Sequence, residues 1–269
     1  MADGSTPPGA SLRFLLLPVV ALIYVFMLGP ILIIVLTSFT ATNSTAFPPQ
    51  GFSLRWYAEF FHADNFIDAF WFSIELAALA APIATVIGFL SAYSIIRFGG
   101  RRRELAQSLS LLPAMVPHIL IGMSLLLALN FVPLPGFSAL LAGHVLICLP
   151  FAIAGVSASL DGVEAQLETA ALTLGASRLR ALWEIVLPLT APGLVSALIF
   201  TFIISFGDAY IALFLSGPGM TTLPIEIYSQ IQWESTPVIS AITSLQILLI
   251  LVLGLVVEKL VGMRRIMRV

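Results

Sequence analysis

The feature that most constrains this chain is a run of 56 residues, 105–160, without a single Asp, Glu, Lys or Arg. An α-helix crosses the hydrocarbon core of a bilayer with about 20 apolar residues, so the run is too long for one span. Near its centre, at 132–136, stands the sequence Val-Pro-Leu-Pro-Gly, which is typical of a tight turn. The run therefore predicts a hairpin of two membrane-spanning helices.

Four further apolar runs predict four more spans. They cover residues 14–39, 66–96, 189–215 and 238–257, and the second contains only two charged residues, Asp68 and Glu75. Hydrophobic residues make up 59% of the 269 residues and charged residues only 10%, which is more apolar surface than a water-soluble domain of this size could bury. The sequence thus predicts an all-α membrane protein with six transmembrane helices.

The first apolar run could be mistaken for a signal peptide. It is about twice as long as the apolar part of such a peptide, and no convincing cleavage site follows it. We therefore expect an uncleaved first span after a cytoplasmic tail over residues 1–12. Because no internal repeat or low-complexity linker is visible, residues 13–269 are expected to form a single six-helix membrane domain.

The basic residues predict the orientation of the chain. Of its twelve Lys and Arg residues, only Arg55 lies in a loop on the outer side of the six predicted spans. The other eleven lie at position 13, within 97–103, at 178 and 180, and within 259–268. Since basic residues concentrate in cytoplasmic loops, both termini and the segment 161–188 are predicted to be cytoplasmic.

The segment 161–188 is polar and separates the predicted hairpin from the fifth apolar run. Small and apolar residues recur in it at helical spacing, which predicts a short helix with a flat apolar face; they are Ala170, Ala171 and Leu174. Gly175 can end this helix in the left-handed conformation, and Ser177 can cap a second short helix. Pro188 then marks the entry into the next span. We expect a helix–turn–helix that docks onto another protein.

The same segment resembles the cytoplasmic coupling loop of type I importer permeases of the ATP-binding-cassette (ABC) superfamily. The family motif is Glu-Ala-Ala, three residues, Gly, nine residues, and Ile-x-Leu-Pro. Six positions match at these spacings: Ala170, Ala171, Gly175, Ile185, Leu187 and Pro188. Thr169 stands where the family has glutamate, and Glu168 comes directly before it. The resemblance implies the type I permease fold and assigns these eight residues to coupling with an ATPase.

Two segments on the outer side resemble the polyamine branch of this family. They are residues 51–57 and the stretch 216–228 after the fifth span, and the resemblance extends over nearly the whole chain. It implies import of a polyamine or a related amine or organic cation. Polyamine members carry two adjacent acidic residues where this chain has Gly207 and Asp208, so one countercharge is missing. A different small solute, amino-acid-like or a phosphonate, therefore stays open.

The resemblance also implies an assembly in the lipid of a bacterial inner membrane. Two permeases, this chain and a homologous partner, would form the pathway, although two copies of this chain remain an alternative. A cytoplasmic ATPase dimer would supply energy and a periplasmic solute-binding protein would deliver solute; no nucleic acid is expected. The single lysine, Lys259, lies outside any phosphate-binding motif, so ATP and Mg²⁺ should bind the ATPase and not this chain. The chain needs no cofactor and is not itself an enzyme.

Polar side chains at membrane depth are costly and are therefore candidates for function. Asp208 is expected in the outer half of the fifth span, and Glu75 lies one turn from Trp71 in the second. We place these residues and Tyr210 on the solute path, because carboxylates and aromatic faces suit a cation or a polar amine. Tyr210, two residues after Asp208, would point from a different helix face. The alternative is that the carboxylates satisfy one another or the helix backbone.

The remaining polar residues give no independent function. His118 and His144 lie in neighbouring predicted spans, but without a third ligand they favour hydrogen bonding in a core or cavity over a metal site. The single cysteine, Cys148, excludes an internal disulfide. An ion-coupled secondary transporter would need matching carboxylates in both halves, for which Glu75 is the only candidate partner of Asp208. A channel would show a pore-lining polar stripe, and none is visible.

Overall fold

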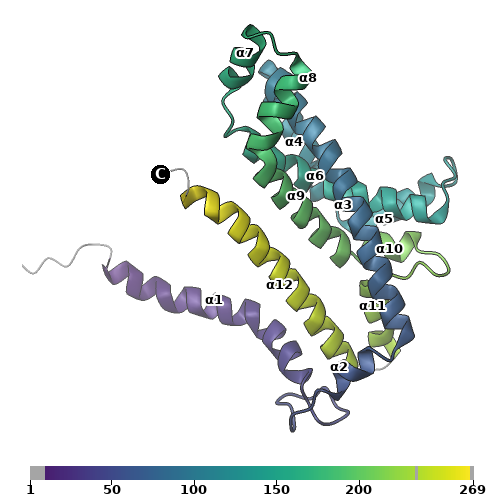
Figure 1. Cartoon of the computed structure of the whole chain (residues 1–269). Coiled ribbons are helices and arrows are strands. Elements are labelled where there is room, and N and C mark those ends of the chain that lie inside the picture. Colours follow the sequence, from purple (N-terminus) through teal and green to yellow (C-terminus); the bar gives the residue numbers. More distant parts are fainter. Residues whose placement is uncertain (1–9, 234–235, 267–269) are drawn as a thin grey trace, which may run out of the picture. The chain divides into compact units, whose positions relative to one another are not determined.

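A computed structural model describes residues 10–233 and 236–266, with side chains from 16 to 233 and from 236 to 259. These residues form helices and no strand, as the sequence predicts (Figure 1). They divide into two compact units: Met1–Ala63 with Gln230–Ile247, and Asp64–Ser229 with Leu248–Val269. Most of the predicted tail 1–12 lies outside the described residues. The division into that tail and one domain over 13–269 stays a prediction.

The first unit contains the first span and the loop that follows it. Helix α1 covers Ala10–Thr37 and the short helix α2 covers Arg55–Phe60. The Trp56 indole N–H donates to the Thr40 carbonyl at 2.8 Å, and the hydroxyls of Ser38 and Tyr57 lie 2.7 Å apart. These bonds fold the loop back onto the end of α1. The last long helix, α12 (Pro237–Ile266), begins in this unit.

The second unit is built on three long helices that lie side by side in Figure 1: α3 (Asp64–Phe98), α6 (Gly136–Leu160) and α9 (Leu187–Gly207). Small residues bring α3 and α6 into close contact, since a Cβ atom added to Gly88 would lie 2.6 Å from the Ala152 Cβ. The core between them contains Leu76, Ala80, Leu140, Ile147 and Cys148. Helix α11 (Leu223–Trp233) begins here, where the Leu223 N–H donates to Ser73 Oγ at 2.7 Å.

The third predicted span is not one straight helix. A short 3-10 turn, Gly100–Arg102, leads into α4 (Arg103–Met115), which is followed by α5 (His118–Ala128) at an angle of 90°. Val116 is extended, with φ −85° and ψ 130°, because a residue before proline is disfavoured in the helical conformation. The described residues therefore contain five helices long enough to cross a membrane, or six if this bent pair is one span. The predicted turn at 132–136 lies between α5 and α6.

The fifth predicted span, 189–215, is wrong at both ends. Helix α8 (Arg178–Ala181), a π-helical turn at Leu182–Val186 and α9 follow one another without a gap, so the helix begins at residue 178. It ends at Gly207, and a separate helix, α10, covers Tyr210–Leu215. Asp208 breaks the helix with φ −77° and ψ 127° because its side chain caps α10, accepting from the Ile211 N–H at 2.7 Å.

Candidate functional site

The segment 161–188 folds as the helix–turn–helix that the sequence predicts. Helix α7 covers Ala165–Thr173, and α8 follows after four residues. Gly175 has a φ of +91°, and the Ala176 N–H donates to the Ala171 carbonyl at 3.0 Å, which closes the end of α7 with a glycine in the left-handed conformation. Ser177 caps α8, since its Oγ accepts from the Arg180 N–H at 3.2 Å. Both predicted roles, the stop and the cap, are confirmed.

Several apolar side chains of this segment are exposed. Leu174 is 89% exposed and Leu179 is 67% exposed, and their neighbours Leu167 and Leu172 are exposed as well. Ala170 and Thr169 also face outward, whereas Ala171 is half-buried. Exposed apolar side chains that gather on one surface are typical of a site that another protein covers. These side chains form a candidate docking face on α7 and on the turn after it, and its use for docking stays a prediction.

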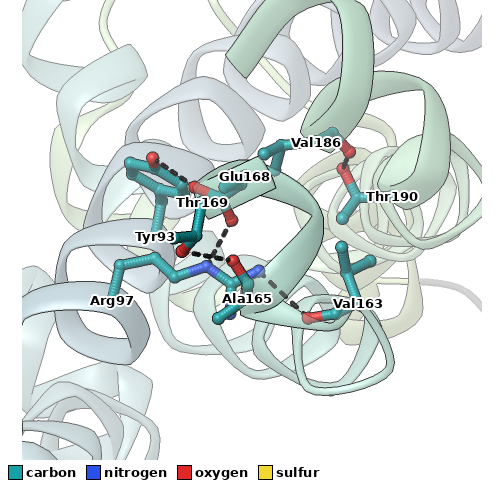
Figure 2. A network of polar contacts seen from close by, with 8 residues as sticks. All are labelled: Tyr93, Arg97, Val163, Ala165, Glu168, Thr169, Val186 and Thr190. Carbon is teal, nitrogen blue, oxygen red and sulfur yellow. Dashed lines mark hydrogen bonds and ion pairs between the residues drawn. The ribbon is translucent and has the colours of Figure 1, made fainter. Parts of the chain in front are cut away.

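Glu168 points toward Tyr93 and Arg97 of α3 (Figure 2). Its Oε1 accepts from Arg97 Nε at 2.6 Å, and its Oε2 accepts from the Tyr93 hydroxyl at 2.9 Å. Arg97 also donates from Nη2 to the Val163 carbonyl at 3.0 Å. The side chains of Arg97 and Glu168 are only 12% and 14% exposed, so this ion pair is shielded from water. It ties α7 to the last two turns of α3.

Thr169 makes no such attachment. Its hydroxyl donates to the Ala165 carbonyl of the same helix at 3.2 Å. The carboxylate that bonds to α3 is therefore at position 168, one residue before the glutamate position of the motif, and it binds within this chain. Sequence reasoning did not find its partners, because Tyr93 and Arg97 lie more than seventy residues earlier in the chain.

The end of the motif anchors the loop to the membrane helices. Val186 is fully buried and belongs to a core cluster with Phe89 and Leu160, and Leu187 packs against that cluster. Ile185 is half-buried in the π-helical turn, while Pro188 is exposed. The turn closes with the Leu187 N–H donating to the Leu182 carbonyl, one residue before a proline that has no N–H to donate.

A second set of hydrogen-bonded polar side chains lies at the break between α9 and α10. Asp208 Oδ1 is 2.8 Å from His118 Nδ1, and its Oδ2 caps α10 as described above. His118 is the first residue of α5, directly after the break at Pro117. The two residues line a cavity of about 490 Å³. The other lining residues are Ile203, Ile204, Gly207, Ala209 and Tyr210.

The structure brings together only some of the predicted solute-path residues. Asp208 and Tyr210 both line this cavity, although Tyr210 is 52% exposed. Trp71 is 63% exposed, and Glu75 is exposed one turn further along α3, so both lie on the outer face of that helix. Neither lines the cavity. Their place on a solute path stays a prediction.

The two histidines have different partners. His118 bonds Asp208, whereas His144 is fully buried and bonds Ser205 Oγ at 2.9 Å. Cys148 is also buried and donates from Sγ to the Thr201 carbonyl at 3.3 Å. No three metal-ligating side chains lie together within the described part of the chain. The predicted hydrogen bonding of both histidines is confirmed, but Asp208 was not predicted as the partner of His118; the position of His118 after Pro117, inside a long apolar run, was the available signal.

The helix arrangement and the loop are those of an importer permease. The chain belongs to the family of binding-protein-dependent transport system inner membrane components, whose family model matches residues 84–264. It is 33% identical, over 86% of its length and 90% of the relative, to the spermidine/putrescine transport system permease protein PotC of Haemophilus influenzae. It is 31% identical, over 82% of both chains, to the putrescine transport system permease protein PotI of Escherichia coli K12.

The fold is similar to that of a solved ABC importer. A chain in the crystal structure of the bacterial alginate ABC transporter, in complex with an alginate pentasaccharide-bound periplasmic protein, superposes with a TM-score of 0.71 at 16% identity, over 92% of both chains. The predicted membership in the importer permease family is confirmed by the family match, and the coupling role of segment 161–188 stays a prediction. This chain is a multi-pass inner-membrane permease component of an ABC transporter.

Proposed function

We propose that this chain is a permease subunit of an ATP-driven importer for a polyamine or a related amine. The observation that supports this proposal most strongly is the sequence similarity, over most of the chain, to permeases named for spermidine and putrescine. The two outer segments, 51–57 and 216–228, agree with it. The chain contributes a path for the solute and performs no covalent chemistry.

Coupling to ATP hydrolysis would start at the apolar face of α7. Two cytoplasmic ATPase subunits, which hold ATP and Mg²⁺, would each receive one such loop in a surface cleft. The exposure of Leu174 and Ala170 supports this docking. When the ATPase subunits close and separate, α7 moves with them, and two attachments carry the movement into the membrane.

The first attachment is the bond of Glu168 to Tyr93 and Arg97, which pulls on α3. The second is the uninterrupted helix of 30 residues from Arg178 to Gly207, about 45 Å long at 1.5 Å per residue. It begins at the docking loop and ends at Asp208, beside the cavity. A shift of the loop therefore changes the cavity, as alternating access requires.

The assembly would contain a second permease related to this one and a periplasmic solute-binding protein. Both termini and the loop 161–188 would face the cytoplasm, in agreement with the distribution of basic residues. A second candidate solute, amino-acid-like or an aminophosphonate with one amine, is favoured by one observation: Asp208 is the only carboxylate among the residues that line the cavity.

The test is uptake by the purified complex in proteoliposomes. The chain, its partner permease and the ATPase are reconstituted with internal ATP, and the binding protein is added outside with radiolabelled putrescine or spermidine. ATP-dependent accumulation of either is expected. Accumulation of a labelled amino acid or aminophosphonate in place of both would establish the second candidate.

A further inference from the structure

Two breaks between consecutive helices lie close together in the second unit. The first lies at Val116–Pro117 between α4 and α5, and the second at Asp208–Ala209 between α9 and α10. The bond between His118 and Asp208 joins them. Non-helical backbone at membrane depth is tolerated where it is buried in protein or lines a cavity, and here it lines one. Broken helices and polar side chains around a cavity are the usual ingredients of a solute site in a transporter.

The Asp208 carboxylate offers little surface to a solute. One carboxylate oxygen is bonded to His118 Nδ1 and the other to the Ile211 N–H, and the side chain is only 2% exposed. The His118 side chain is 27% exposed. A solute that enters the cavity can therefore reach the imidazole ring more readily than the carboxylate, of which little is exposed.

The hydrogen bond to Asp208 determines whether Nε2 of His118 donates or accepts a hydrogen bond. An ionised carboxylate only accepts hydrogen bonds, so Nδ1 of His118 carries the hydrogen that lies between them. Nε2 of the neutral ring is then an acceptor. Such a nitrogen accepts best from a charged N–H group.

We propose that His118, through Nε2, is the residue that binds an ammonium group of the transported solute, and that Asp208 is a positioning residue that holds the ring. This inference rests on the proposed import of an amine. It assigns the contact with the ammonium group to His118, whereas charge alone would assign that contact to Asp208. The isoleucines of the cavity, Ile203 and Ile204, would contact the methylene groups next to the ammonium.

Close packing around the pair keeps this arrangement rigid. A Cβ atom added to Gly122 of α5 would lie 2.9 Å from the Tyr210 carbonyl oxygen and 2.9 Å from Phe214 Cδ2, so the backbones of α5 and α10 are in contact. Helix α5 carries His118 at its first residue, and α10 is capped by Asp208. The ring is therefore held in place before a solute arrives, which lowers the entropic cost of binding.

The test compares variants of the full complex in the uptake assay with labelled putrescine. In His118→Asn the amide nitrogen takes the place of Nδ1, so the bond to Asp208 is retained while the acceptor Nε2 is removed. The half-saturating putrescine concentration should rise on the order of tenfold or more. His62→Asn changes an exposed histidine outside the cavity and should have no effect.

Two further variants separate binding from structure. His118→Gln places an amide oxygen near the position of Nε2 and should take up putrescine better than His118→Ala. Asp208→Asn should raise the half-saturating concentration, and the double variant with His118→Asn should be no worse than the poorer single one, because both changes remove one contact. The inference would be overturned if the two losses multiplied in the double variant. It would also be overturned if the half-saturating putrescine concentration of His118→Asn equalled that of the wild type. If the wild-type complex takes up neither putrescine nor spermidine, the proposed function itself is wrong.

Discussion

At the scale of single residues, a one-position shift of a glutamate changes what it binds. Successive residues of an α-helix point about 100° apart, so side chains at 168 and 169 face different surroundings. Glu168 faces α3 and is bonded there, while Thr169 is exposed. A carboxylate at 169 would lie on the docking face. In this chain the carboxylate at position 168 is thus used for an internal attachment.

Removing the charge of Glu168 should uncouple the loop from α3. Glu168→Gln loses a charge-assisted bond and leaves Arg97 largely buried without its counterion, at a cost of about 1–3 kcal/mol. We expect uptake to fall several-fold, and solute-loaded binding protein to stimulate ATP hydrolysis less. Uptake and ATP hydrolysis in proteoliposomes measure both effects.

The matched control for this change is Glu184→Gln. Glu184 pairs with Arg180 on the same segment, but their side chains are 59% and 66% exposed, so the pair contributes little. The control should couple like the wild type. Equal behaviour of the two variants would mean that the attachment of Glu168 does not transmit movement.

At the scale of elements, the turn after α7 depends on one glycine. Gly175 has open space around the position of a Cβ atom, so a substitution there acts only through its φ of +91°. Gly175→Val forces a β-branched residue into the left-handed region, at a cost of roughly 1–2 kcal/mol or more. Uptake and stimulated ATP hydrolysis should collapse while membrane insertion, followed by fractionation, persists.

Gly254→Val provides the control for that prediction. Gly254 also has nothing near the position of a Cβ atom, but it lies inside α12 with no left-handed φ. The same side chain should be tolerated there. A Gly175→Val complex that couples normally would refute the assigned role of the turn.

The contact between α3 and α6 makes a separate prediction at this scale. Gly88→Ala places a methyl group 2.6 Å from the Ala152 Cβ and 3.1 Å from its backbone, so the helices must separate. We expect a loss of about 1–3 kcal/mol, seen as a lower unfolding temperature of the purified protein. Gly155→Ala, whose Cβ would lie 3.5 Å from Ala197, should be close to neutral. Similar unfolding temperatures for the two variants would contradict the close packing.

The elements also show what a sequence of this kind can and cannot predict. Apolar runs revealed the existence of the spans, and Gly175 and Ser177 revealed the stop and the cap of the loop, because both signals are local. The helix break at Asp208 was not predicted, since an aspartate within an apolar run has the same composition whether or not it caps a following helix. The partners of Glu168 and Asp208 depend on which helices pack together, and no local pattern contains that information.

At the scale of the whole molecule, the orientation in the membrane stays a prediction that labelling can test. Cys148→Ser gives a background without thiols, and a hydroxyl there can still donate to the Thr201 carbonyl. Arg178→Cys should react with an impermeant maleimide only after the membrane is opened, whereas Ser44→Cys should react in intact cells. Reaction at 178 in intact cells would reverse the orientation and move the docking face away from any cytoplasmic ATPase.

The π-helical turn at Leu182–Val186 has a consequence for recombining this loop with other permeases. Such a turn accommodates one residue more than a regular α-helical turn, so it sets the angular register between the docking loop and α9. Deleting one residue there would leave a regular helical turn and nearly the same register, whereas deleting one residue from the regular helix that follows would rotate everything before the deletion by about 100° around the helix axis. Glu168 would then face away from Arg97 even though every residue of the motif was kept. A grafted loop must therefore match this chain in residue count as well as in composition.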